Sequence, residues 1–99
     1  MLVFEIAPED IKIKEDILKS IPNAQVLSVD SLGGNDFIQV IIPLVSVIMP
    51  IASTVIQKYF DDNRVTIKFD GVEISALGYD KAMKILKEVV EQREANKND

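Results

Sequence analysis

The middle of the chain is a long uncharged run that constrains the fold more than any other feature. Residues 37–57 carry no charged side chain, and most of them are Ile, Val, Leu, Met or Phe. Two prolines, Pro43 and Pro50, interrupt the run seven residues apart. A run of this kind is typical of a membrane span, of a buried helix, or of a surface that binds a partner. The rest of the fold must be built around whichever of these it forms.

The polar residues within the run follow a helical spacing. Together with the two prolines they succeed one another at intervals of four and three, as Gln39, Pro43, Ser46, Pro50, Ser53 and Gln57, with Thr54 beside them. This spacing places them on one stripe of a helix, whereas a strand requires simple alternation. We therefore predict one long apolar helix, kinked at the two prolines, with its polar stripe on the convex side that faces water. Asp36 is expected to cap it, after a loop over residues 31–36.

The flanking segments predict strands and two amphipathic helices. Residues 2–6 and 25–29 are typical of short strands. A helix is expected over residues 9–20, opened by Pro8 and two acidic residues, and ended by Pro22. Another is expected over residues 80–94, because its apolar residues recur at a spacing of three and four.

Residues 64–76 predict a β-hairpin. Asp70 and Gly71 are the residues that a type I′ turn favours, because both central positions need a positive φ. The predicted apolar pairs are Phe69–Val72, Ile67–Ile74 and Val65–Ala76, and the polar pairs on the other face are Lys68–Glu73 and Thr66–Ser75. Turn, register and apolar pattern agree.

Together these elements predict a single α+β domain over residues 1–92, followed by a polar frayed tail over residues 93–99. The expected architecture has two layers. It contains a four-stranded sheet with the hairpin in its C-terminal half, the long kinked apolar helix and the two amphipathic helices.

Composition excludes several functions. The net charge of −5 gives no basic surface for a phosphate backbone, so we expect no nucleic-acid partner. The chain has no cysteine and no histidine, hence no thiolate metal site and no histidine base. The acidic residues Asp61, Asp62, Asp70 and Glu73 lack the spacing of a calcium loop. Ser53 and Lys58 are five residues apart and do not share a helix face. We expect neither an enzyme nor a cofactor nor a metal.

The N-terminus lacks the basic region and long apolar stretch of a secretory signal. We accordingly expect a cytoplasmic protein, of a composition common in bacteria.

The predicted long helix is apolar around most of its circumference, and a sheet can cover only one side of it. Its flanks should then be exposed in a monomer and form an interface with a second copy, unless the other two helices bury them within one chain. The predicted interface residues are Val40, Leu44, Val47, Met49, Ile51 and Ile56. Two alternatives remain open. One is a small-ligand sensor with an apolar pocket under the helix, lined by Ser46, Met49 and Ser53. The other is a single-pass membrane protein spanning residues 37–57.

The order of the predicted elements resembles the effector-associated constant component family of bacterial conflict systems. The resemblance rests on an opening strand and helix, a glycine-containing loop before a long apolar helix, a helix end IQKYFDDN, the hairpin VTIKFDGVEIS and the closing helix DKAMKILKEVVE. It implies a non-enzymatic accessory component that acts beside an effector protein through protein contacts. It carries no catalytic motif, and no site residue follows from it.

Overall fold

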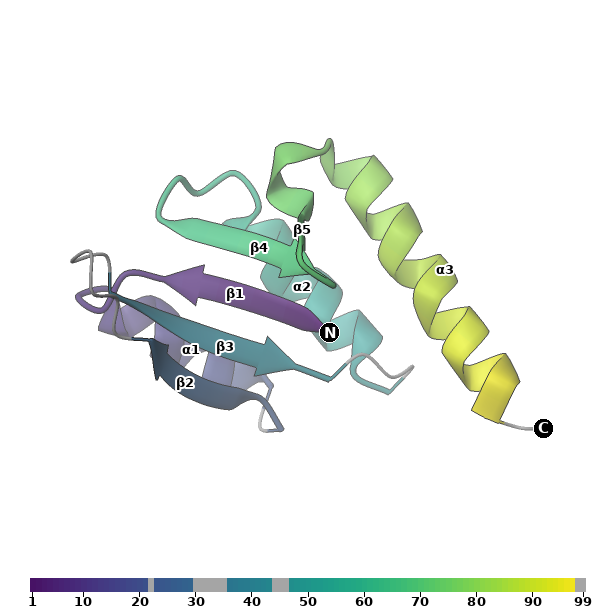
Figure 1. The fold of residues 1–99 in the computed structure, drawn as a ribbon, viewed down its shortest axis with the longest axis horizontal. Helices are drawn as coiled ribbons and strands as arrows, with labels where there is room; N and C mark the ends of the chain where they lie inside the picture. The colour runs from purple at the N-terminus through teal and green to yellow at the C-terminus, as the bar shows by residue number, and fades with distance from the viewer. Residues whose placement is uncertain (22, 30–35, 44–46, 98–99) are drawn as a thin grey trace.

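The described residues form one antiparallel sheet with helices packed against one of its faces (Figure 1). The computed structural model describes residues 1–21, 23–29, 36–43 and 47–97, with residues 93–97 described by their backbone only. The strands are β1 (Leu2–Ile6), β2 (Gln25–Val29), β3 (Phe37–Ile42), β4 (Val65–Phe69) and β5 (Val72–Glu73). The helices are α1 (Ile11–Ser20), α2 (Met49–Tyr59) and α3 (Tyr79–Lys97), and a single 3₁₀ turn, η1 (Ile74–Ala76), follows β5.

The central strand of the sheet is β1. The strand order is β2-β3-β1-β4-β5, and every neighbouring pair is antiparallel. Three apolar rows cross the sheet on its helix side: Ile42–Leu2–Phe69, Val40–Phe4–Ile67 and Ile38–Ile6–Val65. All nine side chains are buried. These rows form the sheet half of the hydrophobic core.

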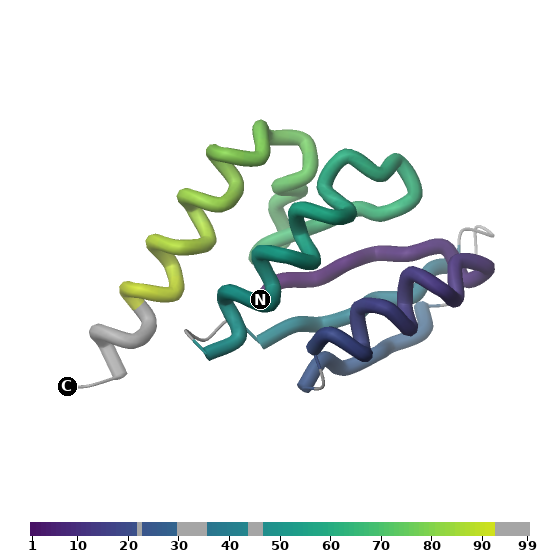
Figure 2. The backbone as a smooth tube through the Cα atoms, turned by 180° about the vertical axis from the view of Figure 1, so that it is seen from behind, coloured from purple at the N-terminus to yellow at the C-terminus, as the bar shows by residue number. Residues whose placement is uncertain are grey.

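The helices supply the other half of the core. Figure 2 shows α2 between α1 and α3, and α2 contacts both of them. Each helix buries apolar residues at a spacing of three or four, namely Ile13 and Ile17 on α1, Ala52, Val55, Ile56 and Tyr59 on α2, and Ala82, Leu86 and Val90 on α3. The domain therefore has two layers, with α3 at the far side of α2 from α1.

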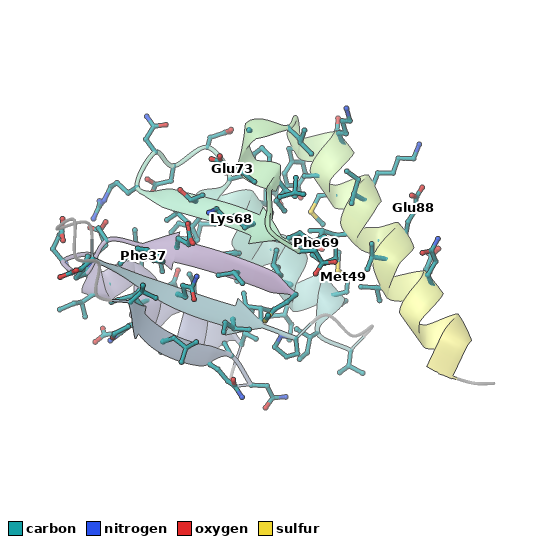
Figure 3. The ribbon with its side chains drawn as sticks, viewed as in Figure 1. Phe37, Met49, Lys68, Phe69, Glu73 and Glu88 are labelled. Atoms are coloured by element: carbon teal, nitrogen blue, oxygen red, sulfur yellow. The ribbon has the colours of Figure 1, made fainter. Side chains whose placement is uncertain are left out.

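The opposite face of the sheet is not covered by any described helix (Figure 1). Val3, Glu5, Gln39 and Ile41 lie on it and are half-buried. The Glu5 carboxylate lies 3.2 Å from the Lys68 ammonium and accepts a hydrogen bond of 3.4 Å from the Gln39 amide. Figure 3 shows Lys68 on this face of the sheet. An antiparallel sheet with one solvated face commonly mixes polar and apolar residues in this way.

The prediction of one long kinked helix beside a four-stranded sheet is wrong. Residues 37–42 form β3, which pairs with β1 on one side and β2 on the other, so the described sheet has five strands. The helix that follows, α2, begins only at Met49 and has 11 residues. Pro43 comes directly after β3, and Pro50 lies in the first turn of α2, where a missing N–H leaves no hydrogen bond unmade. The prolines delimit two elements rather than kinking one.

The strand forms because residues 37–42 suit a nearly central position in a sheet. Four of the six are β-branched: Ile38, Val40, Ile41 and Ile42. Burial alternates along the strand, with Ile38, Val40 and Ile42 against the helices and Gln39 on the open face. Residues 37–42 thus belong to a series with helical four-and-three spacing although they themselves form a strand. Across the described part of the chain, no helix is both long enough and apolar enough to cross a membrane.

The other strand predictions are confirmed for β1 and β2, and the hairpin prediction is confirmed at its turn. Asp70 and Gly71 have φ of 49° and 85°, and Phe69–Val72 and Lys68–Glu73 pair as predicted. The remaining predicted pairs are wrong: Ile67–Ile74, Val65–Ala76 and Thr66–Ser75. The chain turns into η1 at Ile74 instead, which buries Ile74 and brings the Ser75 hydroxyl 3.4 Å from the Ile67 N–H that donates to it.

The helix predicted over residues 9–20 is α1, which begins at Ile11, and the helix predicted over residues 80–94 is α3, whose backbone continues to Lys97. The loop predicted over residues 31–36 lies outside the described residues except for Asp36. That residue was expected to cap a helix and instead precedes β3.

The one-sided core gives a direct test. Phe4 is fully buried beneath the helices, whereas its neighbour Val3 lies on the open face. We expect Phe4→Ala to lower the free energy of unfolding by about 3–5 kcal/mol, because it leaves a cavity in the central row. Val3→Ala should cost about 1 kcal/mol or less. Urea unfolding followed by circular dichroism measures both, and equal losses would contradict the one-sided arrangement.

Candidate interaction surface

An apolar ridge lies at the start of α2 and is called here the α2 ridge. It consists of the exposed residues Val47, Pro50 and Ile51 and of Met49, which is half-buried against the core. Val47 and Ile51, four residues apart in the sequence, have exposed fractions of 81% and 41%. Ile48, between them in the sequence, is buried in the core and holds this segment in place.

A groove of about 640 Å³ separates one flank of the ridge from α3. Its walls come from the first turns of α2 and from one face of α3. The main apolar lining residues are Met49, Pro50, Tyr79, Met83 and Val90. Figure 3 shows Met49 between the two helices, and Glu88 on the outer side of α3. On the α3 side, Val90 belongs to the core, and Tyr79 and Met83 pack against the core while part of each stays exposed to the groove.

A second, smaller hollow of about 370 Å³ lies on the other flank of the ridge. It is lined by Ser20 of α1 and by Pro50, Ile51, Thr54 and Val55 of α2. Pro50 borders both hollows. The α2 ridge thus stands between two depressions, a shape that fits an apolar partner with a complementary cleft.

The polar groups around the ridge do not favour an ion or a reaction. The groove rim carries Asp80, Lys84, Lys87 and Glu91, two charges of each sign. The Ser53 hydroxyl donates to the Met49 carbonyl at 2.9 Å. This bond to the carbonyl four residues earlier is the ordinary one for a serine within a helix. The surface can therefore bind by apolar contact, with a rim of mixed charge.

The other end of α2 is tied to α1 by a charged cluster. The Asp16 carboxylate accepts a hydrogen bond of 2.7 Å from the Lys58 ammonium and another from the Tyr59 hydroxyl. Hydrogen bonding from Lys58 and then from Tyr59 lowers the pKa of Asp16 below its usual value. Burial, followed by the bond to Asp16, raises the pKa of Tyr59. These bonds fix the C-terminal end of α2 and leave the ridge at its free end.

A second ion pair joins the start of α1 to the loop before β4. Asp10, the one charged side chain that is buried in the described residues, accepts a hydrogen bond from the Arg64 guanidinium. This bond lowers the pKa of Asp10. The backbone N–H of Arg64 donates to the Asp62 carboxylate at 2.8 Å, which orders the loop.

The structure separates the six predicted interface residues. Val40 and Ile56 are fully buried, the first in β3 and the second in α2, so neither is available to a partner. Val47, Met49 and Ile51 come together in the α2 ridge. Leu44 lies outside the described residues.

The predicted ligand pocket is also rearranged. Met49 and Ser53 line the groove between α2 and α3, not a space between a long helix and the sheet. Ser46, the third predicted lining residue, lies outside the described part of the chain. The apolar stripe predicted for the closing helix includes Met83 and Val90, and both do pack in or against the core. Sequence reasoning missed that they also line the groove.

The residues considered for a metal site or a Ser–Lys pair do not come together in the structure. Among the described residues, no group of three acidic side chains could hold a metal ion. Asp61, Asp62 and Glu73 border a small polar hollow, whereas Asp70 accepts a hydrogen bond from the N-terminal amine of Met1. Lys58, once considered as a partner of Ser53, pairs with Asp16.

Comparisons of this chain with protein families, with curated proteins and with solved structures found no match. The function of the chain is therefore inferred from its surface alone.

The two ion pairs predict a loss of stability in acid. Both carboxylates have a lowered pKa in the folded protein, so they contribute fully above the ordinary value of 3.8. Their contribution is lost as the pH falls below 3.8 and through the lowered values. We expect Asp10→Asn to be less stable than the wild type at neutral pH and to lose less on acidification. Urea unfolding at a series of pH values measures this.

Glu15→Gln, which removes an exposed carboxylate from the same helix α1, serves as the control. If Asp10→Asn follows the wild-type curve throughout this acidic range, the ion pair with Arg64 does not contribute as described.

Proposed function

We propose that the protein is a non-enzymatic interaction module, an accessory component that binds an apolar segment of another protein on the α2 ridge. The observation that carries the proposal is the joint exposure of Val47 and Ile51 on either side of a buried anchor, Ile48. Exposed apolar side chains that cluster in this way, with a polar rim, are characteristic of protein interfaces.

The chemistry of the surface favours a protein over a charged ligand. The two rim acids and two rim lysines leave no excess of either sign, so an ion gains little there. The hollows on both flanks offer space for side chains from a partner, and Pro50 lies between them. An amphipathic helix laid beside the ridge could fill the groove with residues at a spacing of three and four.

The resemblance to the effector-associated constant component family, if it holds, would make the partner an effector protein. That resemblance counted a long apolar helix, in whose place the chain has β3 and α2. The proposal therefore depends on the ridge and not on the order of elements.

Site-specific photo-crosslinking in cells that make the protein tests this. A photoreactive residue at Lys84, on the groove rim, should form a discrete adduct with a partner protein. The same residue at Lys12, exposed on α1 and outside the lining of both hollows, should form none. Val47→Glu should reduce the Lys84 adduct by roughly tenfold or more, because it places a charge in the apolar interface.

Val47 is largely solvent-exposed, so the Val47→Glu variant should keep the wild-type unfolding curve. Equal adducts from Lys84 and Lys12, or an adduct that survives Val47→Glu unchanged, would contradict the proposal.

A second candidate function is a small-ligand sensor, supported by the size and apolar lining of the groove. Its volume of about 640 Å³ falls within the range that binds small organic molecules. Native mass spectrometry of the gently purified protein distinguishes the two functions. A bound small molecule that Met83→Glu displaces supports the sensor, and an unmodified mass together with a protein adduct supports the interaction module.

A further inference from the structure

The two edges of the described sheet are protected unequally. At one edge β5 pairs through only two residues, Val72 and Glu73, and the chain then turns into η1. A very short strand that carries a charge is a usual defence against pairing with another chain. At the other edge β2 pairs with β3 over five consecutive residues with no bulge.

None of the usual protections is present on β2. Its sequence, QVLSV, contains no charge, no proline and no glycine. Four of its five residues are exposed, and Val26 and Leu27 are 37% and 50% exposed. Figures 1 and 2 agree that no described helix or strand lies beyond it. Its outer N–H and C=O groups form a free ladder for another strand.

We propose that β2 pairs with β2 of a second copy of this chain, antiparallel and centred on Leu27, to form a continuous ten-stranded sheet. This surface is separate from the α2 ridge, and its partner is the same protein. The occupant is argued from the strand itself, because this register sets the exposed Leu27 opposite Leu27 and no charged residue opposite another.

The pairing follows from the register. A twofold axis perpendicular to the sheet at Leu27 keeps the open face of both copies on the same side. Leu27 then lies opposite Leu27 of the second copy and Gln25 opposite its Val29, all on the open face. Val26 lies opposite Ser28 on the helix side. All five residues of each strand are paired, and the two exposed apolar side chains of β2 are covered.

The charge of the chain does not favour self-association. Each copy carries a net charge of −5, so two copies repel one another at long range. Strand β2 itself carries no charged residue, so its pairing with a second β2 sets no charged residue of one strand opposite another. Salt screens the repulsion, so added salt should strengthen the dimer, whereas it would weaken one held by ion pairs.

Sedimentation velocity over a roughly thousandfold range of concentration tests the proposal. The wild type should pass from monomer to dimer and stop there. Leu27→Lys sets two ammonium groups against each other at the axis and should weaken the dimer by roughly tenfold or more. Val72→Lys, an equal change at an exposed apolar residue of the opposite edge, should dimerise as the wild type does.

Hydrogen exchange supplies a second readout that does not need a variant. In the wild type, protection of β2 amides should rise with protein concentration, while that of β4 amides should not change. Circular dichroism checks that Leu27→Lys folds, and Ser28→Lys, at another exposed position on the same strand, replaces it if it does not.

A wild type that stays monomeric at every concentration would overturn the proposal, and so would a dimer that survives Leu27→Lys. A dimer lost in Val47→Glu but kept in Leu27→Lys would place the second copy on the α2 ridge instead. If the wild type forms the β2 dimer but no adduct at Lys84, the proposed function is contradicted and the β2 dimer is not.

Discussion

The structure depends on β1 being apolar on its helix side and paired along both edges. Leu2, Phe4 and Ile6 each lie in a row between a residue of β3 and a residue of β4, and all three are almost completely buried. Burial of apolar side chains is the main favourable contribution to folding, and these three lie in the central strand of the core. The helices must then lie on that one side. This burial does not determine what contacts the opposite face or the two edges of the sheet.

Much of this arrangement could be predicted from local sequence patterns. Strand β3, which joins β2 to β1 in the sheet, could not. Asp70 and Gly71 specify their turn by backbone conformation alone, and β2 is bounded by clear turn residues, so both predictions hold. Residues 37–42 were misassigned because Gln39 happens to lie four residues before Pro43. The β-branched composition of that segment was the better indicator, since a strand flanked on both sides needs no long polar stripe.

The candidate surface was only partly accessible to sequence reasoning. Val47, Met49 and Ile51 are predicted as flanks of a long helix. Val47 and Ile51 are exposed for a different reason, at the start of a short helix, and Met49 is half-buried there. The groove depends on how closely α3 approaches α2. The spacing of residues such as Met83 and Val90 predicts a helix but not its distance from another helix. The open edge at β2 appears only once the strand order is known, because the same residues in a central strand would be buried.

The central claim is that residues 37–42 form a strand between β1 and β2 while the helix begins only at Met49. Backbone nuclear Overhauser effects measured by NMR test it most directly. The account predicts cross-strand contacts from Val40 to both Phe4 and Val26, the partners that it has in the sheet. A continuous series of contacts between residues three apart, running from residue 37 through residue 59, would restore the long helix and contradict the account.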